Sequence, residues 1–375
     1  EKSMLKAYKF KLEPTTLQVE HIESTLNLCR WLYNTALEQR KFTYKHRNIS
    51  TRYSMQQNEL PQLKKELPVF KQVQSQVLQD VLRRLDKAFQ AFFRRLKTGD
   101  KAGYPRFRGK NRYNSFTYPQ SGFLLEDQFL KLSKIGKVRI KCHRQMKGKV
   151  KTCSIISKNG KYYACFSCKV EPVAHQAGGR VGIDLGVKHL AITSDGKFFD
   201  PPKYLRKSER KLKQLQRNVS RRKKGSNRRK KAVALLAKMH EYIANQRKDT
   251  AHKISRYLVD HYDLIAFEDL HISGMVKNHK LAKSIVDAGW DQLVRFTNYK
   301  AEYAGKKVIQ VDPTNTTQAC SACGQIVKKE LKDRVHRCSC GYTEDRDINA
   351  AKNILYKAIG FVPMMEQGQL KQNLI

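Results

Sequence analysis

Four cysteines near the C-terminal end of the chain restrict its fold more than any other feature. They follow the spacing C-x2-C-x14-C-x-C and are Cys320, Cys323, Cys338 and Cys340. This spacing is close to that of a zinc ribbon, in which thiolates on two tight turns enclose one Zn²⁺ ion and the metal contributes much of the folding free energy. The second pair is one residue shorter than C-x2-C, so His336 remains an alternative ligand. We predict one structural zinc ion in residues 314–341.

Three acidic residues occupy positions where a buried strand or the start of a helix would place them. Asp184 lies in the apolar run VGIDLGV, Glu268 ends IAFE, and Asp347 begins DINAAKNILYKAI. A buried carboxylate without a partner costs roughly several kcal/mol, so each pairs either with a lysine or arginine or with a metal ion. The order strand-Asp, strand-Glu, helix-Asp is the one by which RNase H-like folds hold two divalent ions about 3.5–4 Å apart for phosphodiester cleavage. We therefore predict that these residues are catalytic and bind two Mg²⁺ ions, which suit carboxylate oxygens.

Neighbouring acidic residues are weaker candidates for this site. Asp269 falls where its strand is ending, and Asp312 ends the strand KKVIQVDP. Asp345 precedes Asp347 by two residues, so on a helix the two point in nearly opposite directions, and we expect Asp345 to cap the helix. GIDLG also opens the sugar-kinase and actin-type ATPases, but the sequence lacks the Gly-rich adenosine-binding segment that those enzymes need.

The charge of the chain indicates a nucleic-acid partner. Its 75 lysines and arginines exceed its 33 acidic residues and give a formal net charge of +42. Phosphate backbone converts such an excess into affinity through counterion release, whereas without a partner the charges repel one another. A membrane surface is the rival partner, but no apolar run approaches the roughly 18–20 residues of a spanning helix and no signal peptide is apparent.

The nine cysteines form an odd set in a chain without an export signal, which argues against a disulfide framework and for a reducing, cytoplasmic compartment. Cys165 and Cys168 form a further C-x2-C. They lie in a predicted strand, where residues three apart point to opposite faces, so we interpret them as packing residues.

The N-terminal half combines strands with an inserted helical unit. SMLKAYKFKL alternates as a strand does, and short strands resume at YPRFRGK, with a hairpin predicted at Asn159-Gly160. Residues 15–98 have helical spacing, and a long helix after Pro68 is expected to bury one apolar stripe. That stripe comprises Val73, Val77, Val81, Leu85, Phe89, Phe92 and Leu96.

The second half follows the order β-β-β-α-β-α-β, with the cysteine segment between the last strand and a final helix. The first part of its long helical stretch is too charged to bury a full face, and such runs are often solvated faces or disordered arms. Gly225-Ser226 divides the stretch into a predicted helical hairpin. We expect the basic residues at its bend to contact phosphate; they are Arg221, Arg222, Lys223 and Lys224.

Taken in order, GIDLGVKHLAITSDG, IAFEDL, SIVDAGW and CSACG…CSCGYTEDRDINAAKNI resemble the TnpB family of transposon-encoded RNA-guided nucleases, relatives of the type V CRISPR effectors. TTLQ…CRWLYNTAL and YPRFRGK fit the same family. The resemblance implies a multidomain α+β fold. Its parts are a wedge-type β-barrel (1–14 and 104–175), a helical recognition domain (15–103), an RNase H-like RuvC nuclease domain (176–313 and 342–360), a zinc ribbon (314–341) and a tail (361–375).

The resemblance also implies a function. A guide RNA from the transposon end pairs with one strand of double-stranded DNA, the protein recognises a short flanking motif, and one Mg²⁺-dependent site cuts both strands. The family's catalytic Asp, Glu and Asp match Asp184, Glu268 and Asp347. A prokaryotic, nucleoid-associated monomer with one RNA is expected. Candidate nucleic-acid contacts in the first half are Tyr53, Arg83, Arg84, Arg106, Arg108, Tyr113 and Phe116.

Two other functions remain open. A guided DNA-binding regulator would lack cleavage, but the presence of all three acidic residues favours the enzyme. An unguided RuvC-type nuclease would need neither the helical unit nor the cysteine module.

Overall fold

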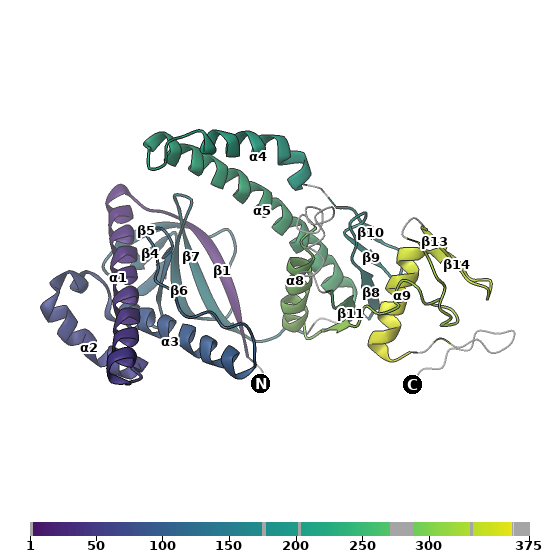
Figure 1. Ribbon diagram of the computed structural model, residues 1–375, viewed down its shortest axis with the longest axis horizontal. Coiled ribbons are helices and arrows are strands. Elements are labelled where there is room, and N and C mark those ends of the chain that lie inside the picture. Colours follow the sequence, from purple (N-terminus) through teal and green to yellow (C-terminus); the bar gives the residue numbers. More distant parts are fainter. Residues whose placement is uncertain are drawn as a thin grey trace. The chain divides into compact units, whose positions relative to one another are not determined.

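The computed structural model describes residues 3–174, 178–201, 204–270, 288–330, 333–361 and 363. The chain divides into two compact units, Glu1–Glu171 and Pro172–Ile375 (Figure 1). The SIVD part of the motif SIVDAGW and nearly all of the predicted tail lie outside the described residues.

The first unit contains a seven-stranded sheet in the order β2-β6-β7-β1-β5-β4-β3. Its strands are β1 (Met4–Glu13), β2 (Ser115–Tyr118), β3 (Phe123–Glu126), β4 (Phe129–Leu132), β5 (Gly136–Lys141), β6 (Lys149–Lys158) and β7 (Lys161–Val170). The rings of Tyr118 on β2 and Phe123 on β3 lie 6.5 Å apart, so the two edges approach each other and the sheet nearly closes. The predicted hairpin is confirmed, with Asn159 (φ 50°) and Gly160 (φ 72°) forming the two-residue turn between β6 and β7.

Helices inserted after β1 cover this sheet. They are α1 (Thr16–Arg47), α2 (Tyr53–Glu66), the 3-10 helix η1 (Pro68–Gln72) and α3 (Ser75–Lys97). The predicted stripe on α3 is buried as far as Phe89, but Leu96 is 54% exposed. The prediction was wrong for this last turn, where Arg94, Arg95 and Lys97 surround Leu96 and the helix buries none of its residues.

The second unit contains a five-stranded sheet in the order β10-β9-β8-β11-β12. Its strands are β8 (Arg180–Asp184), β9 (Ala191–Thr193), β10 (Phe198–Phe199), β11 (Leu264–Glu268) and β12 (Lys307–Val311). The strands β8, β11 and β12 are parallel, and β9 and β10 are antiparallel to their neighbours. Among its described residues, the helices are α4 (Tyr204–Ser220), α5 (Asn227–His261), α8 (Trp290–Tyr303) and α9 (Arg346–Ile359). The order of elements agrees with the β-β-β-α-β-α-β prediction.

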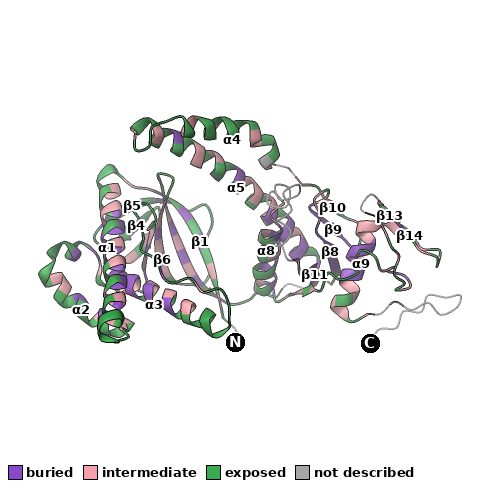
Figure 2. Cartoon of the chain, in the orientation of Figure 1, coloured by how far each residue is buried: buried purple, intermediate pink, exposed green. Residues whose placement is uncertain are grey.

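The two faces of this sheet are covered by different helices. Side chains of β8 and β11 that include Val181, Ile183 and Phe267 form one core cluster with residues of α5 and α8. The opposite face carries α9, because a Cβ atom added to Gly182 would lie 1.9 Å from the carbonyl oxygen of Ala351. Glycine at this position therefore allows the α9 backbone to lie directly on β8 (Figure 2).

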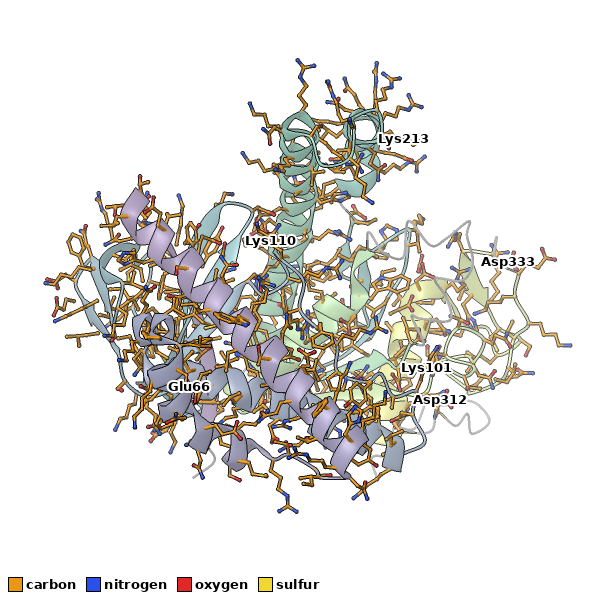
Figure 3. The ribbon with its side chains drawn as sticks, turned by 60° about the vertical axis from the view of Figure 1, so that its left-hand side comes forward. Glu66, Lys101, Lys110, Lys213, Asp312 and Asp333 are labelled. Carbon is orange, nitrogen blue, oxygen red and sulfur yellow. The ribbon has the colours of Figure 1, made fainter. Side chains whose placement is uncertain are left out.

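The charged stretch is a hairpin of two helices, as predicted. The helix α4 ends at Ser220, Gly225 adopts a φ of 88°, and Ser226 caps α5 by accepting a hydrogen bond from the Arg229 amide. Most of α4 is exposed (Figure 2), and polar side chains project from both helices around Lys213 (Figure 3). In the described parts of the chain, the helices are too short or too polar to cross a membrane.

Candidate active site and cysteine cluster

The register of the sheet brings two of the predicted acidic residues together. Ile183 on β8 pairs with Phe267 on β11, so Asp184 and Glu268 follow in adjacent positions on neighbouring parallel strands. Side chains alternate along a strand, so both point to the face of Gly182, which is the face that α9 covers.

Helix α9 brings the third acidic residue to the same place. From Gly182 to Asp184 the strand advances about 6.6 Å, and from Ala351 back to Asp347 the helix advances about 6 Å. Since Gly182 touches Ala351, the first turn of α9 lies over the end of β8. Asp184, Glu268 and Asp347 therefore converge, although they are separated along the chain by two helical segments and the cysteine insertion.

The electrostatics of this group favour a cation. Asp184 is 8% exposed and Glu268 is 7% exposed. Burial, followed by the negative charges of Glu268 and Asp347, raises the pKa of Asp184 to about 8, although the positive charge of Arg346 acts in the opposite direction. Burial also raises the pKa of Glu268, against a hydrogen bond from Thr316 and the charge of Lys357. Carboxylate oxygens crowded in this way fit a hard divalent cation, which would relieve their repulsion.

Two contacts hold the carboxylates in their present positions. The Thr316 hydroxyl donates to Glu268 Oε1, and Arg346 Nε lies 3.0 Å from Asp347 Oδ1. Within the described ranges, the cysteine cluster has all of its metal-ligand atoms within 4.8 Å of one another, and the three carboxylates do not form such a group. A site for two ions about 3.5–4 Å apart does not need all of its ligand atoms that close.

The neighbouring acidic residues have other roles. Asp345 caps α9, as predicted, and its Oδ1 accepts hydrogen bonds from the backbone amides of Asp347 (2.8 Å) and Ile348 (3.3 Å). Asp312 is exposed and accepts from the backbone amide of Thr314 at 2.9 Å. Asp269 is also exposed, beyond the end of β11.

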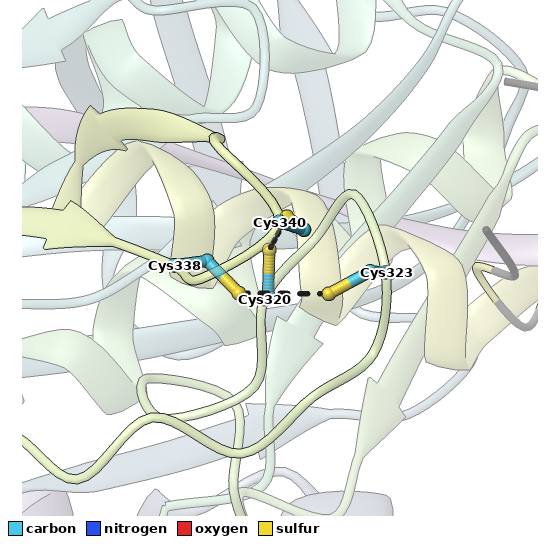
Figure 4. A group of neighbouring side chains, drawn as sticks. All are labelled: Cys320, Cys323, Cys338 and Cys340. Carbon is cyan, nitrogen blue, oxygen red and sulfur yellow. Dashed lines mark hydrogen bonds between the residues drawn. The ribbon is translucent and has the colours of Figure 1, made fainter. Parts of the chain in front are cut away.

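The four cysteines form a compact cluster (Figure 4). The sulfur atoms of Cys320 and Cys340 lie 3.8 Å apart, and those of Cys323 and Cys338 lie 3.6 Å apart. Tetrahedral zinc with bonds of about 2.3 Å places its sulfur ligands about 3.8 Å apart, so the cluster fits one ion. His336, the alternative ligand, is fully buried on β13 (Val335–Arg337) and is not part of this cluster. The strand β13 pairs with β14 (Thr343–Asp345) to form a hairpin that leads directly into α9.

Some predicted nucleic-acid contacts already have protein partners. Arg84 pairs with Asp80 (2.8 Å) and donates to Ser115 and Thr117 on β2, which ties α3 to the sheet. Phe116 is 1% exposed and belongs to the core, so its prediction as a contact was wrong. It lies on the buried face of β2, where nucleic acid has no access.

Other predicted contacts lie on the surface of the first unit. The Arg83 guanidinium lies 5.5 Å from the ring centroid of Tyr53 and donates to its hydroxyl. The Arg108 guanidinium lies 5.5 Å from the ring of Tyr33, and Arg106 is exposed. Tyr113 is half-buried beside the Arg84 guanidinium, at 5.9 Å. The predicted contacts of the second unit, Arg221, Arg222, Lys223 and Lys224, are all exposed at the bend between α4 and α5.

Four residues near the carboxylates were missed in the sequence: Thr316, Arg346, Asn349 and Asn353. The two asparagines lie four positions apart on an otherwise apolar helix face, and both are buried. A buried amide needs hydrogen-bond partners, so this spacing could have indicated a polar contact between α9 and the cysteine segment.

Sequence families match most of the chain. The family described as "Probable transposase" (OrfB of the IS605 type) matches residues 164–279, and the Cas12f1-like TNB domain matches residues 290–354. A "Helix-turn-helix domain" matches residues 4–48, which form the strand β1 and the single helix α1.

Solved structures have a similar fold. A Cas12f1 in complex with a guide RNA and target DNA superposes with a TM-score of 0.61 at 11% identity, over 94% of this chain and 98% of that one. The mini-RNA-guided endonuclease CRISPR-Cas_phi3 gives a TM-score of 0.51 at 10% identity, over 97% and 93%. At such identities the likeness shows the fold alone, a multidomain α+β architecture.

Two relatives extend over nearly the whole chain. The "Putative RNA-guided DNA endonuclease InsQ" of Escherichia coli K12 is 33% identical, covering 94% of this chain and 92% of the relative. A "Putative RNA-guided DNA endonuclease" of Streptomyces pristinaespiralis is also 33% identical, covering 93% and 88%. The motifs in the sequence predicted the same relationship, and the chain belongs to the OrfB/TnpB family of the IS605 type.

Proposed function

We propose that the chain is an RNA-guided DNA endonuclease whose RuvC-type site consists of Asp184, Glu268 and Asp347. The observation that carries this proposal is the convergence of the three carboxylates where β8, β11 and α9 meet. A protein that only binds DNA would have no need of three carboxylates gathered at one point. Their negative charges repel phosphate, which the formal net charge of +42 otherwise attracts.

The carboxylates are proposed to bind two Mg²⁺ ions. Bound Mg²⁺ would activate water and stabilise the leaving oxygen of the cleaved phosphodiester. The residues of the chain would hold the ions and orient them, with Glu268 and Asp184 fixed by the sheet and Asp347 by the first turn of α9. The cysteine cluster would hold one structural Zn²⁺ ion.

The partners are proposed to be a guide RNA from the transposon end and double-stranded DNA that carries a short flanking motif. Pairing between guide and target would read the sequence, while the protein would supply positive charge along the backbones. We propose one copy of the chain for each RNA, acting at the nucleoid in the prokaryotic cytoplasm.

Replacement of Asp184 tests the proposed nuclease function directly. Asp184→Ala is expected to abolish cleavage of a guide-matched plasmid in the presence of Mg²⁺ and to leave guided binding to the target nearly unchanged, because the side chain is buried and faces the carboxylate group. The protein would be purified with the RNA expressed from its own locus, and plasmid cleavage and target binding would be measured on the same preparation.

Asp312→Ala is the matched control, because this exposed carboxylate directly follows β12 and accepts hydrogen bonds from Thr314. Cleavage by the control variant should equal that of the unaltered protein. Binding without cleavage by the unaltered protein would instead support a regulator, and cleavage without guide RNA would support an unguided nuclease.

A further inference from the structure

Two buried asparagines join helix α9 to the cysteine segment. The Asn349 side chain accepts a hydrogen bond from the Ser321 amide (2.9 Å) and donates to the Ala319 carbonyl (2.8 Å). Asn353, one turn later, donates to the carbonyls of Ala319 (2.7 Å) and Thr316 (2.9 Å). The backbone on both sides of Cys320 is therefore attached to the helix that carries Asp347.

Thr316 continues this connection to the active site. Its side chain is 2% exposed, and its hydroxyl lies within hydrogen-bond distance of Glu268 Oε1 and of the Pro313 carbonyl (3.0 Å). A hydroxyl has one proton to donate, and a carboxylate accepts more strongly than a neutral carbonyl. Thr316 therefore donates to Glu268, while its own carbonyl is fixed by Asn353.

Arg346 connects Asp347 to a later part of the cysteine segment, just before β13. Arg346 Nη1 donates to the carbonyl of Asp333 (3.0 Å), and its backbone amide donates to the carbonyl of Arg334 (2.9 Å). The same guanidinium pairs with Asp347. Thr316 thus contacts Glu268 directly, and Arg346 links the backbone at Asp333 and Arg334 to Asp347.

We propose that Thr316 is a positioning residue: it transmits the rigid geometry of the cysteine segment to Glu268 and so sets the affinity of the carboxylate site for divalent metal. The proposal rests on the proposed function, in which Glu268 binds metal. Residues that orient a metal ligand typically contribute about 10–100-fold to metal affinity or activity.

The test compares Thr316→Ser with Thr316→Ala, which differ only in one hydroxyl group. Mn²⁺ binding to the full-length, zinc-loaded protein would be measured by electron paramagnetic resonance, and guided cleavage would be measured over a range of Mn²⁺ concentrations. We expect Thr316→Ala to raise the half-saturating Mn²⁺ concentration about 10–100-fold in both measurements. Thr316→Ser should behave as the unaltered protein does.

Thr317→Ala is the control, because this neighbouring threonine is exposed. Zinc content and melting temperature would be measured for every variant, so that loss of folding is recognised. If Thr316→Ala does not fold, the isosteric Thr316→Val provides the same comparison.

Equal Mn²⁺ affinity of the Ser and Ala variants would overturn the proposal. Failure of the proposed function gives a different result, since cleavage by the unaltered protein would then be absent or would survive Asp184→Ala. The Mn²⁺-binding measurement does not depend on cleavage, so it tests the role of Thr316 whether or not the protein cuts DNA.

Discussion

Asp184 shows how one buried side chain links proton binding, metal binding and stability. It lies beside Glu268 and Asp347, and its pKa is raised from the ordinary value of 3.8 to about 8, first by burial and then by these neighbours. Between those two values the folded protein keeps a proton that the unfolded chain releases. The free energy of unfolding therefore falls as the pH rises through this window, and the fall ends above the folded pKa.

We expect the Mg²⁺-free protein to melt at lower temperature as the pH rises from about 5 to about 8. Added Mg²⁺ should raise the melting temperature more at pH 8 than at pH 5, because protons compete with the metal for the same carboxylates. Melting curves of the unaltered protein and of Asp184→Asn would check this. The variant should show a weaker pH dependence, and an equal dependence in both proteins would contradict the prediction.

At the scale of elements, the cysteine segment is an insertion whose geometry the proposed zinc ion would hold. The hairpin β13–β14 is short, and the cluster of four sulfur atoms holds its base together with the loop around Cys320. Without zinc, no bond would join the four sulfur atoms, and the hydrogen bonds from Asn349 and Asn353 would lose their fixed partners.

Cys320→Ser is therefore expected to reduce zinc content, melting temperature and guided cleavage together. Metal analysis, melting curves and plasmid cleavage on one preparation would measure the three. Cys142→Ser is the matched control, because Cys142 is exposed and lies outside the cluster. A Cys320→Ser protein with full stability and activity would show that the segment functions without its metal.

The sequence predicted those elements whose side chains follow a simple repeat. The strand β1, the Asn159-Gly160 turn and the order of strands around Asp184 all have local signals, either alternation or turn residues. The helical unit predicted over residues 15–98 agrees with α1, α2 and α3, but the prediction extended the buried stripe of α3 to Leu96. The end of that stripe depends on which surface lies opposite the helix, and a single helix does not encode that information.

The same distinction applies to the candidate site. Asp184, Glu268 and Asp347 are recognisable as acidic residues in apolar surroundings, and the structure brings them together through Gly182. Thr316 has no such local signal. It lies in a run of polar residues, and its burial arises from Asn353 and Glu268, which are far away along the chain.

At the scale of the whole molecule, a net charge of +42 should govern binding to nucleic acid. Each phosphate contact releases counterions, so affinity falls as salt concentration rises. The bend between α4 and α5 presents four cationic side chains to solvent, and basic side chains line both helices beside it.

Replacing Arg221, Arg222, Lys223 and Lys224 with glutamine is expected to weaken RNA or DNA binding. If all four contact phosphate, the slope of log affinity against log salt should decrease in magnitude by about 3. Binding measured at several salt concentrations gives this slope. Unchanged affinity and slope would show that the bend does not contact nucleic acid.

The contact between Gly182 and α9 also means that the proposed active site is completed late in the synthesis of the chain. The strand β8 is synthesised long before α9, and the α9 backbone occupies the space where a side chain of residue 182 would stand. During translation, Asp184 and Glu268 are synthesised before Asp347. With the proposed roles of the three carboxylates, a nascent chain that lacks α9 would be unable to cleave DNA, and premature termination before α9 would yield a protein without a complete set of carboxylates.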